Sequence, residues 1–203
     1  MGENTYKSVL VFRLILKFGK VGSLSFNGVL RRQKLAALML GVVAGVIAVF
    51  AERADAFMTG GNLTPLGYVN TYTWILVSAL LFGFWGAIIT TEVQALLGLL
   101  SFANPLSWLW PFVNLLFALA VGIVVVCFSK WRPNTRVSFK LLIMSFVCAL
   151  LDIPLVYFVM VICLNLPFVV YIGALPVYIV LQLVPSTILA YYLVRALKRS
   201  KVC

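Results

Sequence analysis

The sequence predicts an all-α integral membrane protein with six transmembrane helices and an N-terminal amphipathic helix at the membrane interface. Hydrophobic residues make up 64% and charged residues 10% of the 203 residues, whereas soluble domains average roughly 45–50% and about 25%. A soluble chain of this length could not bury so much apolar surface. The composition therefore excludes a soluble globular domain, a disordered chain and, despite a net charge of +11, a nucleic-acid-binding module.

The first part of the chain, residues 1–33, is expected to be a cytoplasmic or interfacial segment, and residues 34–203 the six-helix membrane domain. Within residues 6–20, Arg13, Lys17 and Lys20 recur at helical spacing beside apolar residues. The uncharged runs between them are too short to cross a bilayer. A basic amphipathic helix of this kind binds the surface of an anionic membrane.

Six spans follow from the apolar stretches and the breakers between them. The stretch 68–103 carries one charged residue, Glu92. It is too long for one span and just long enough for two short spans, with a turn at Gly83-Phe84-Trp85-Gly86. Helix-breaking residues separate the other spans. The last of these breaks is expected to be a turn formed by Asn165, Pro167 and Gly173. The six predicted spans are about 35–51, the two halves of 68–103, 108–128, 141–164 and 175–197.

The distribution of basic residues supports six spans. With six spans, all of the 16 Lys and Arg residues except Arg53 fall on one side of the membrane. Because cytoplasmic loops of membrane proteins are enriched in Lys and Arg, we expect a multi-pass protein of the cell membrane with both termini in the cytoplasm. A single span over 68–103 would move the basic loop 130–140 to the opposite side.

Glu92 and Asp152 are the only acidic residues inside the predicted spans. A carboxylate that faces lipid is costly, so each should face a cavity, a partner or a hydrogen-bond donor. One interpretation is a structural carboxyl group bonded to Trp, Tyr or Asn side chains, and the other is a contact to a ligand or a proton site. Further candidates for substrate binding are polar and aromatic residues in the outer half of the predicted bundle: Asn70, Trp108, Asn114, Tyr178 and Gln182. An interfacial aromatic belt or hydrogen bonds between helices would also explain them.

The first predicted span carries a stripe of small residues, namely Ala37, Gly41, Ala44, Gly45 and Ala48. Small residues at a spacing of four let another helix approach closely. The stripe is therefore a candidate docking surface for a partner subunit, although packing inside the chain would explain it equally well.

Several chemistries lack their usual residues. The chain has no His, and its four Cys residues show no CxxC spacing, so neither a metal site nor a cofactor is expected. Acidic residues are too few and too scattered for a Mg²⁺-dependent enzyme, and a GxxxxGK[ST] loop for ATP is missing. We therefore expect no enzyme. The alternatives kept open are a small membrane enzyme of lipid or isoprenoid metabolism and a ligand-free membrane scaffold subunit.

Three features, in this order, resemble the substrate-binding S components of energy-coupling factor (ECF) vitamin transporters. The first is Ala44-Gly-Val-Ile-Ala48 in the first span, followed by a long outer loop. The second is the turn Phe82-Gly-Phe-Trp-Gly-Ala87 between two short helices, with Glu92 shortly after it. The third is the last span with its basic end, Pro185-Ser-Thr-Ile-Leu-Ala-Tyr-Tyr-Leu-Val-Arg195.

This resemblance implies a subunit that captures a vitamin or vitamin precursor from outside, in a pocket under the first loop. It also implies docking on a transmembrane T component driven by two ATPase subunits, besides contact with membrane lipids. Two mid-membrane acids without a matching base suit a cationic or amine-bearing substrate such as thiamin or a pyrimidine precursor, and nearby aromatic rings would stack on it.

Overall fold

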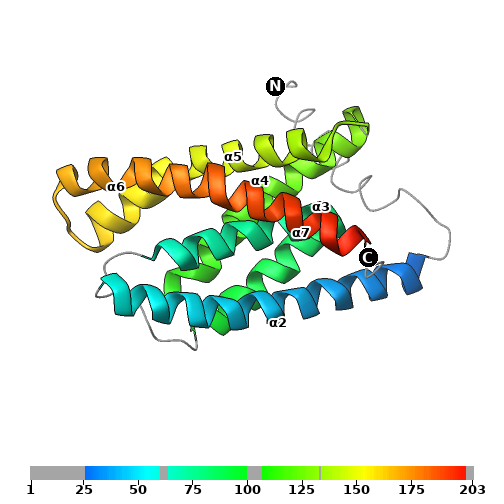
Figure 1. Cartoon of the computed structure of the whole chain (residues 1–203), viewed down its shortest axis with the longest axis horizontal. Coiled ribbons are helices and arrows are strands. Elements are labelled where there is room, and N and C mark those ends of the chain that lie inside the picture. Colours follow the sequence, from blue (N-terminus) through cyan, green and yellow to red (C-terminus); the bar gives the residue numbers. More distant parts are fainter. Residues whose placement is uncertain (1–25, 60–63, 100–106, 133, 200–203) are drawn as a thin grey trace, which may run out of the picture. The chain divides into compact units, whose positions relative to one another are not determined.

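The computed structural model describes residues 26–59, 64–99, 107–132 and 134–199 (Figure 1). The predicted interfacial helix at 6–20 and the break at Asn104-Pro105 lie outside these residues. The chain divides into two compact units, Met1–Arg32 and Gln33–Cys203. The second unit contains all the contacts described below.

The described part of the chain is almost entirely helical, which confirms the all-α part of the predicted fold class. The α-helices are α2 (Phe26–Thr59), α3 (Pro65–Leu99), α4 (Trp110–Trp131), α5 (Val137–Tyr157), α6 (Phe168–Leu181) and α7 (Thr187–Arg199). A 3₁₀ turn at Ser107–Leu109 precedes α4, and a π-helix at Phe158–Cys163 continues α5. A second π-helix, at Gln182–Ser186, joins α6 to α7. Among the described residues, five continuous helices are long and apolar enough to cross a membrane.

The helix α3 is a hairpin of two arms. Its backbone leaves the helical conformation at Gly83, with φ 70° and ψ −157°. Beyond this point the chain runs back along itself, since Gln94 forms a hydrogen bond with Thr71. The reversal lies in the predicted Gly83–Gly86 turn, and the arms 65–82 and 84–99 are each about 25 Å long at 1.5 Å per residue. Each arm is thus close to the roughly 30 Å thickness of the hydrocarbon layer.

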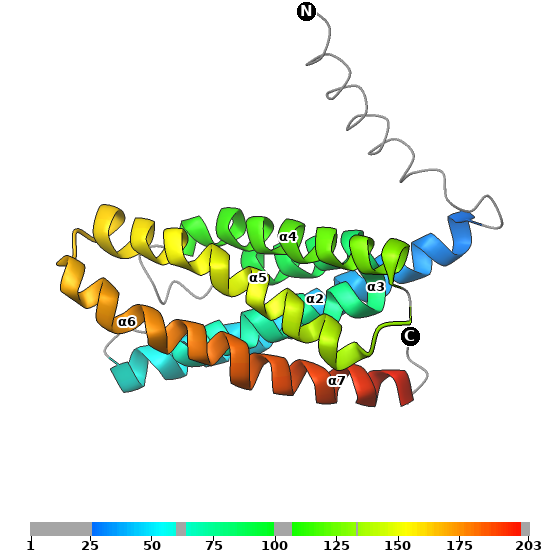
Figure 2. The ribbon, with the colours of Figure 1, turned by 90° about the horizontal axis from the view of Figure 1, so that it is seen from above.

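The helix ends fall into two groups, which Figures 1 and 2 show at opposite ends of the bundle. One end contains the Gly83 reversal, the α4–α5 connection and the end of α7. Most basic residues of the unit lie at this end: Lys34, Lys130, Arg132, Arg136, Lys140, Arg195, Lys198 and Arg199. The end of α2, the start of α3 and the α5–α6 connection lie at the other end. We refer to these as the basic end and the far end.

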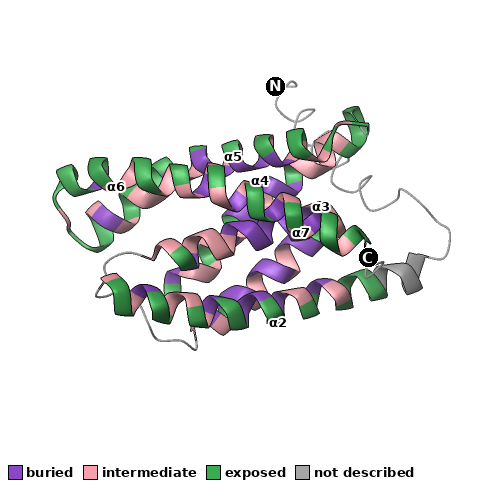
Figure 3. Ribbon diagram, in the orientation of Figure 1, coloured by how far each residue is buried: buried purple, intermediate pink, exposed green. Residues whose placement is uncertain are grey.

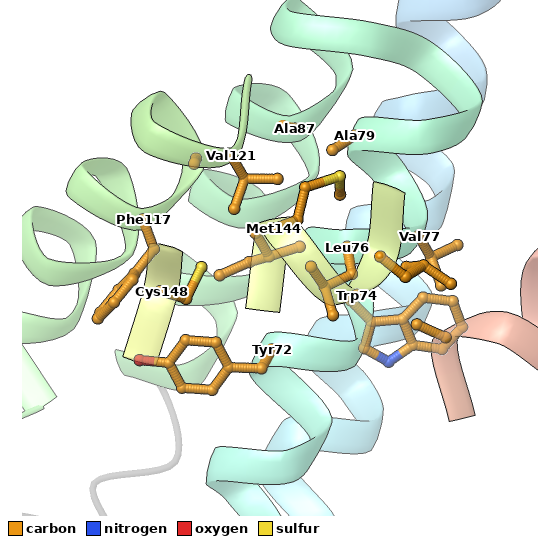
Figure 4. Packing of buried hydrophobic residues seen from close by; sticks show 14 of the residues in the cluster. Tyr72, Trp74, Leu76, Val77, Ala79, Ala87, Phe117, Val121, Met144 and Cys148 are labelled. Carbon is orange, nitrogen blue, oxygen red and sulfur yellow. The ribbon is translucent and has the colours of Figure 1, made fainter. Parts of the chain in front are cut away.

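The first arm of α3 forms the centre of the unit (Figure 3). Residues 72–79 are buried without interruption, as expected of a helix surrounded by others. In Figure 4, Tyr72 lies beside Phe117 of α4 and Cys148 of α5, and the ring centroids of Tyr72 and Phe117 are 5.0 Å apart. Large apolar side chains such as Phe50 and Phe112 are exposed on the outside of the bundle, where lipid would cover them.

Two predicted boundaries need correction. The last helix begins at Phe168 rather than near 175, because Gly173 lies inside it and does not break it. The turn before it is short and uses Asn165, whose φ of 51° is in the left-handed region that Asn tolerates better than most residues. The first helix is also longer than 35–51, extending to Thr59.

Candidate functional site

A cavity with a volume of ≈ 110 Å³ lies toward the far end of the bundle. It is enclosed by the second half of α2, both arms of α3, the start of α4, the end of α5 with its π-helix, and α6. Each wall contributes at least one polar side chain: Glu52, Tyr68, Gln94, Asn114, Asp152 and Tyr178. Polar groups at this depth in a membrane protein are expensive and therefore indicate a functional site.

Asp152 of α5 accepts hydrogen bonds from several side chains. It is 2% exposed. Tyr72 donates a hydrogen bond of 2.8 Å to Oδ1, and Tyr68 donates a hydrogen bond to Oδ2. The two tyrosines are four residues apart on the first arm of α3 and so share one helix face. One carboxyl group thereby joins α5 to the centre of the bundle.

A third donor comes from the last helix. With its side-chain amide oriented to satisfy both neighbours, Gln182 donates from Nε2 to Oδ2 of Asp152, and its Oε1 accepts from the backbone N–H of Ala149 at 3.2 Å. Gln182 is fully buried and begins the π-helix between α6 and α7. Local π-helices frequently occur at functional sites.

Aromatic rings form a column along one side of the cavity. The ring of Tyr68 lies between those of Tyr72 and Tyr178, with centroid distances of 4.5 and 4.8 Å. Phe117 extends the column beyond Tyr72. Such a wall offers both apolar surface and π-faces to a flat or cationic ligand.

Glu52 of α2 lies between two glycines of the α3 hairpin. A Cβ atom added to Gly67 would lie 3.2 Å from Cγ of Glu52, and one added to Gly98 would lie 3.5 Å from its Oε1. Because neither glycine has a side chain, the carboxyl group of Glu52 can approach the walls of the cavity formed by both arms.

Gln94 of the second arm also lines the cavity and is 2% exposed. Its Nε2 donates a hydrogen bond of 2.8 Å to Oγ1 of Thr71, another residue of the cavity wall. Its Oε1 has no hydrogen-bond partner among the described residues. Leaving a buried acceptor unpaired costs about 1–3 kcal/mol.

Asp55 closes the far end of the structure beside the cavity. It is fully buried, and its carboxylate accepts hydrogen bonds from the backbone N–H groups of Leu66 at 3.0 Å and Gly67 at 2.8 Å. These groups belong to the first turn of α3, where N–H groups lack partners within the helix. Asp55 is therefore a helix cap supplied by a neighbouring helix.

The structure brings together part of the predicted substrate-binding set. Asp152, Asn114 and Tyr178 line the cavity, and Gln182 lies behind Asp152. Three others lie elsewhere. Glu92 is half-buried outside the cavity wall, and its Oε1 has no partner among the described residues.

The other two predicted residues outside the cavity have different environments. Trp108 is exposed in the 3₁₀ turn before α4. Asn70 holds helices together, because its Oδ1 accepts from Nε1 of Trp74 at 2.9 Å and its Nδ2 donates to the backbone oxygen of Ala44 at 3.3 Å. This is the interhelical role that the sequence left open for such residues.

The small residues of α2, a predicted docking surface, are covered inside the chain. Ala37, Gly41, Ala44, Gly45 and Ala48 are all buried. A Cβ atom on Gly41 would lie 2.8 Å from the backbone oxygen of Thr90, and one on Gly45 would lie 2.6 Å from Leu97. The second arm of α3 thus packs against this stripe. In this structure the stripe serves packing inside the chain, the second of the two interpretations of the sequence.

Sequence reasoning missed Glu52, Gln94, Tyr68 and Tyr72 as residues of the site. Glu52 directly follows the apolar run of the first predicted span, and the two tyrosines stand at the start of the next apolar stretch. Gln94 alone carried a recognisable signal, because an amide well inside an apolar stretch needs a partner.

The fold and the cavity together define a helical protein of multi-pass type with a polar chamber in one half of its bundle. Comparisons with protein-family models, with curated proteins and with solved structures give no match to this chain.

Proposed function

We propose that this protein is a membrane-embedded substrate-capture subunit that takes up a small molecule from outside the cell. The observation that carries the proposal is the position of the polar cavity, toward the end of the bundle opposite the basic end. If the arms of α3 cross the membrane separately, there are six spans, and the enrichment of basic residues on the cytoplasmic side assigns the basic end and both termini to the cytoplasm. The cavity then lies in the outer half of the membrane.

The size and chemistry of the cavity support a small ligand. An apolar cavity of about 150 Å³ holds benzene, so ≈ 110 Å³ suits a ligand with no more than a single small ring inside the cavity, any substituents lying in its opening to the surface. Aromatic rings, two carboxyl groups and two amides surround this volume. A vitamin or a vitamin precursor with one polar ring, such as the pyrimidine part of a thiamin-like compound, meets these requirements.

Energy for uptake has to come from elsewhere, because the sequence contains no ATP-binding loop. The resemblance to S components of ECF transporters supports docking on a T component that is driven by two ATPase subunits. The stripe on α2 is covered by α3, so docking there would require α3 to move away.

Native mass spectrometry of the purified full-length protein tests the proposal directly. We expect a bound small molecule on the wild-type protein. Gly98→Leu places a large side chain at the cavity wall and should abolish binding, whereas Gly173→Leu makes the same change where an added Cβ meets nothing within 4 Å and should preserve it. If neither a bound molecule nor stabilisation by a panel of vitamins is observed, the capture function is refuted and a ligand-free scaffold role is favoured.

A further inference from the structure

A second pocket, with a volume of ≈ 350 Å³, opens at the basic end of the bundle, between the start of α5 and the end of α7. The two helices are in contact deeper in the bundle, where Ser145 of α5 and Thr187 of α7 share a hydrogen bond. Figures 1 and 2 show this end of α7 far from the α5–α6 connection, so the pocket is separate from the cavity described above. Its lining consists of Val137, Tyr191, Val194, Arg195, Lys198 and Arg199.

The lining of this second pocket is strongly basic. Three of its side chains are cations and none of its described lining residues is acidic. Arg195, Lys198 and Arg199 are spaced three and four residues apart, so they share one face of α7, and all three are exposed. The acid of α5, Asp152, lies about 22 Å further along that helix than Val137 at 1.5 Å per residue. Cations held this close repel one another, and a bound anion would relieve the repulsion.

The start of α5 favours a ligand of the same sign. Val137 is the first residue of α5, and Arg136 at its N-cap forms no side-chain cap hydrogen bond. The N-terminus of a helix carries partial positive charge, and its first N–H groups have no partners within the helix. Guanidinium groups bind phosphate through two parallel hydrogen bonds, so the arginines of the pocket suit a phosphate group in particular.

The surface next to the pocket indicates a lipid phosphate rather than a soluble one. Tyr192 and Ile188 lie three and seven residues before Arg195, on the same face of α7. Their side chains are 62% and 50% exposed. They form an apolar strip that leads from the pocket toward the middle of the bundle. A phosphate in the pocket would therefore have, beside it, a surface against which an acyl chain can pack.

We propose that this pocket binds the phosphate headgroup of an anionic phospholipid, with Arg195, Lys198 and Arg199 as its charged contacts and an acyl chain along Tyr192 and Ile188. Basic pockets between transmembrane helices on the cytoplasmic side bind such headgroups, and the proposed topology assigns the basic end to that side. The inference goes beyond the proposed function, because it concerns the other end of the bundle and needs no ligand in the cavity.

Three probes distinguish the sources of phosphate and the role of charge: phosphatidylglycerol, phosphatidylcholine with the same acyl chains, and soluble glycerol phosphate. Binding of the two lipids to the purified full-length protein in detergent would be measured by titration with native mass spectrometry. We expect phosphatidylglycerol to bind at least about tenfold more tightly than phosphatidylcholine, whose headgroup has no net charge. A large molar excess of glycerol phosphate should not displace it, because the soluble compound lacks the acyl chains.

Variants identify the residues responsible. The pocket variant carries three changes, Arg195→Gln, Lys198→Gln and Arg199→Gln. It should weaken phosphatidylglycerol binding about tenfold or more and leave phosphatidylcholine binding nearly unchanged. The matched control removes the same charge from exposed side chains of the basic end that lie outside the pocket, through Lys34→Gln, Lys130→Gln and Arg132→Gln. Phosphatidylglycerol binding to the control should be nearly that of the wild type.

A further variant separates loss of charge from loss of fold. Arg195→Lys combined with Arg199→Lys keeps both charges and should retain most of the phosphatidylglycerol binding. The single change Lys198→Gln, at an exposed side chain, should weaken binding several-fold without altering the melting temperature. If binding is the same in this single variant and in the wild type, Lys198 is not a contact of the headgroup and the proposed site is wrong.

Each remaining outcome overturns a defined part of the inference. If the pocket variant and the control lose phosphatidylglycerol equally, the basic end attracts anionic lipid as a whole and the pocket is not a site. If the two lipids bind equally well, the anionic class is refuted. If glycerol phosphate displaces phosphatidylglycerol, the ligand is a soluble phosphate compound instead of a lipid. None of these results affects the cavity at the far end, whose ligand is tested separately.

Discussion

Gln94 donates a hydrogen bond of 2.8 Å to Oγ1 of Thr71, although 23 positions of a nearly continuous helical segment separate the two residues. An uninterrupted helix would hold them about 34 Å apart. The reversal at Gly83 is therefore what creates two walls of the cavity from one apolar stretch. It also leaves the remaining side-chain oxygen of Gln94 without a hydrogen-bond partner among the described residues.

Gly83→Ala should destabilise the protein. The backbone at this position has φ 70° and ψ −157°, a conformation available essentially only to glycine, and forcing a side chain into it costs on the order of 1–3 kcal/mol. Thermal unfolding in detergent should show a lower midpoint for this variant. Gly173→Ala is the control, since it lies in α6 with nothing within 4 Å of an added Cβ, and it should be neutral or slightly stabilising. Equal midpoints for the two variants would contradict a strained reversal at Gly83.

Ala44→Trp should unfold or strongly destabilise the protein. Ala44 is 0% exposed and packs in the central cluster, and its backbone oxygen accepts a hydrogen bond from Asn70. Inserting a large ring there overfills a close contact between helices. Val43→Trp, next to it but 49% exposed, should be tolerated. Melting curves and gel filtration of both variants distinguish the cases, and a well-folded Ala44→Trp protein that loses only transport would restore the stripe as a docking surface for a partner.

Asp55→Ala should lower stability by about 1–2 kcal/mol, the usual range for loss of a helix cap. The carboxylate is buried and accepts from the N–H groups of Leu66 and Gly67, so its removal leaves two donors of α3 without their partner. Asp55→Asn keeps one acceptor and should lose less. Chemical unfolding would measure both changes, with the exposed Arg53→Ala as the control. An unchanged free energy of unfolding would show that water replaces the cap.

The topology predicts opposite accessibility of the two ends. In a variant without native cysteines, a single Cys at Thr59 should react with an impermeant reagent added to intact cells, and a single Cys at Asn134 should react only after permeabilisation. Thr59 ends α2 at the far end and Asn134 lies in the α4–α5 connection at the basic end. Labelling of both from the same side would overturn the six-span arrangement.

The sequence predicted the elements that depend on local patterns. Length and a glycine-rich turn were enough to place the reversal at Gly83, and apolar stretches located the other helices. The start of the last helix was wrong because Gly173 counted as a breaker, although glycine is common inside transmembrane helices.

The candidate site was predictable only in part, for a physical reason. Asp152 and Tyr178 stood out because a polar group inside a span needs a partner. Which partner it finds depends on helix packing: Tyr68 and Tyr72 meet Asp152 from a segment 80 or more positions away, and no local pattern encodes this. Glu52 and Asp55 looked like the polar end of a span, yet Glu52 lines the cavity and Asp55 caps α3.

The hydrogen bonds to Asp152 predict that mutations of Tyr72 on α3 and of Asp152 on α5 have coupled effects on stability. Tyr72 is buried, with its hydroxyl 2.8 Å from Oδ1 of Asp152, so Tyr72→Phe removes a donor from a buried carboxyl group and should cost about 1–3 kcal/mol. Asp152→Leu removes the shared acceptor and leaves the hydroxyl groups of Tyr68 and Tyr72 and the amide of Gln182 unpaired. It should be the more damaging change.

Once the acceptor is gone, the Tyr72 hydroxyl has lost its partner, so adding Tyr72→Phe to Asp152→Leu should cost little or should even restore stability. A double-mutant cycle on the free energy of unfolding should therefore give a coupling of about 0.5–3 kcal/mol, the range found for residues that share one hydrogen-bond network. Tyr192→Phe, at a tyrosine that is 62% exposed on α7, is the matched control and should be additive with Asp152→Leu. If the Tyr72 and Asp152 changes were additive as well, Tyr72 would not be a partner of the carboxyl group.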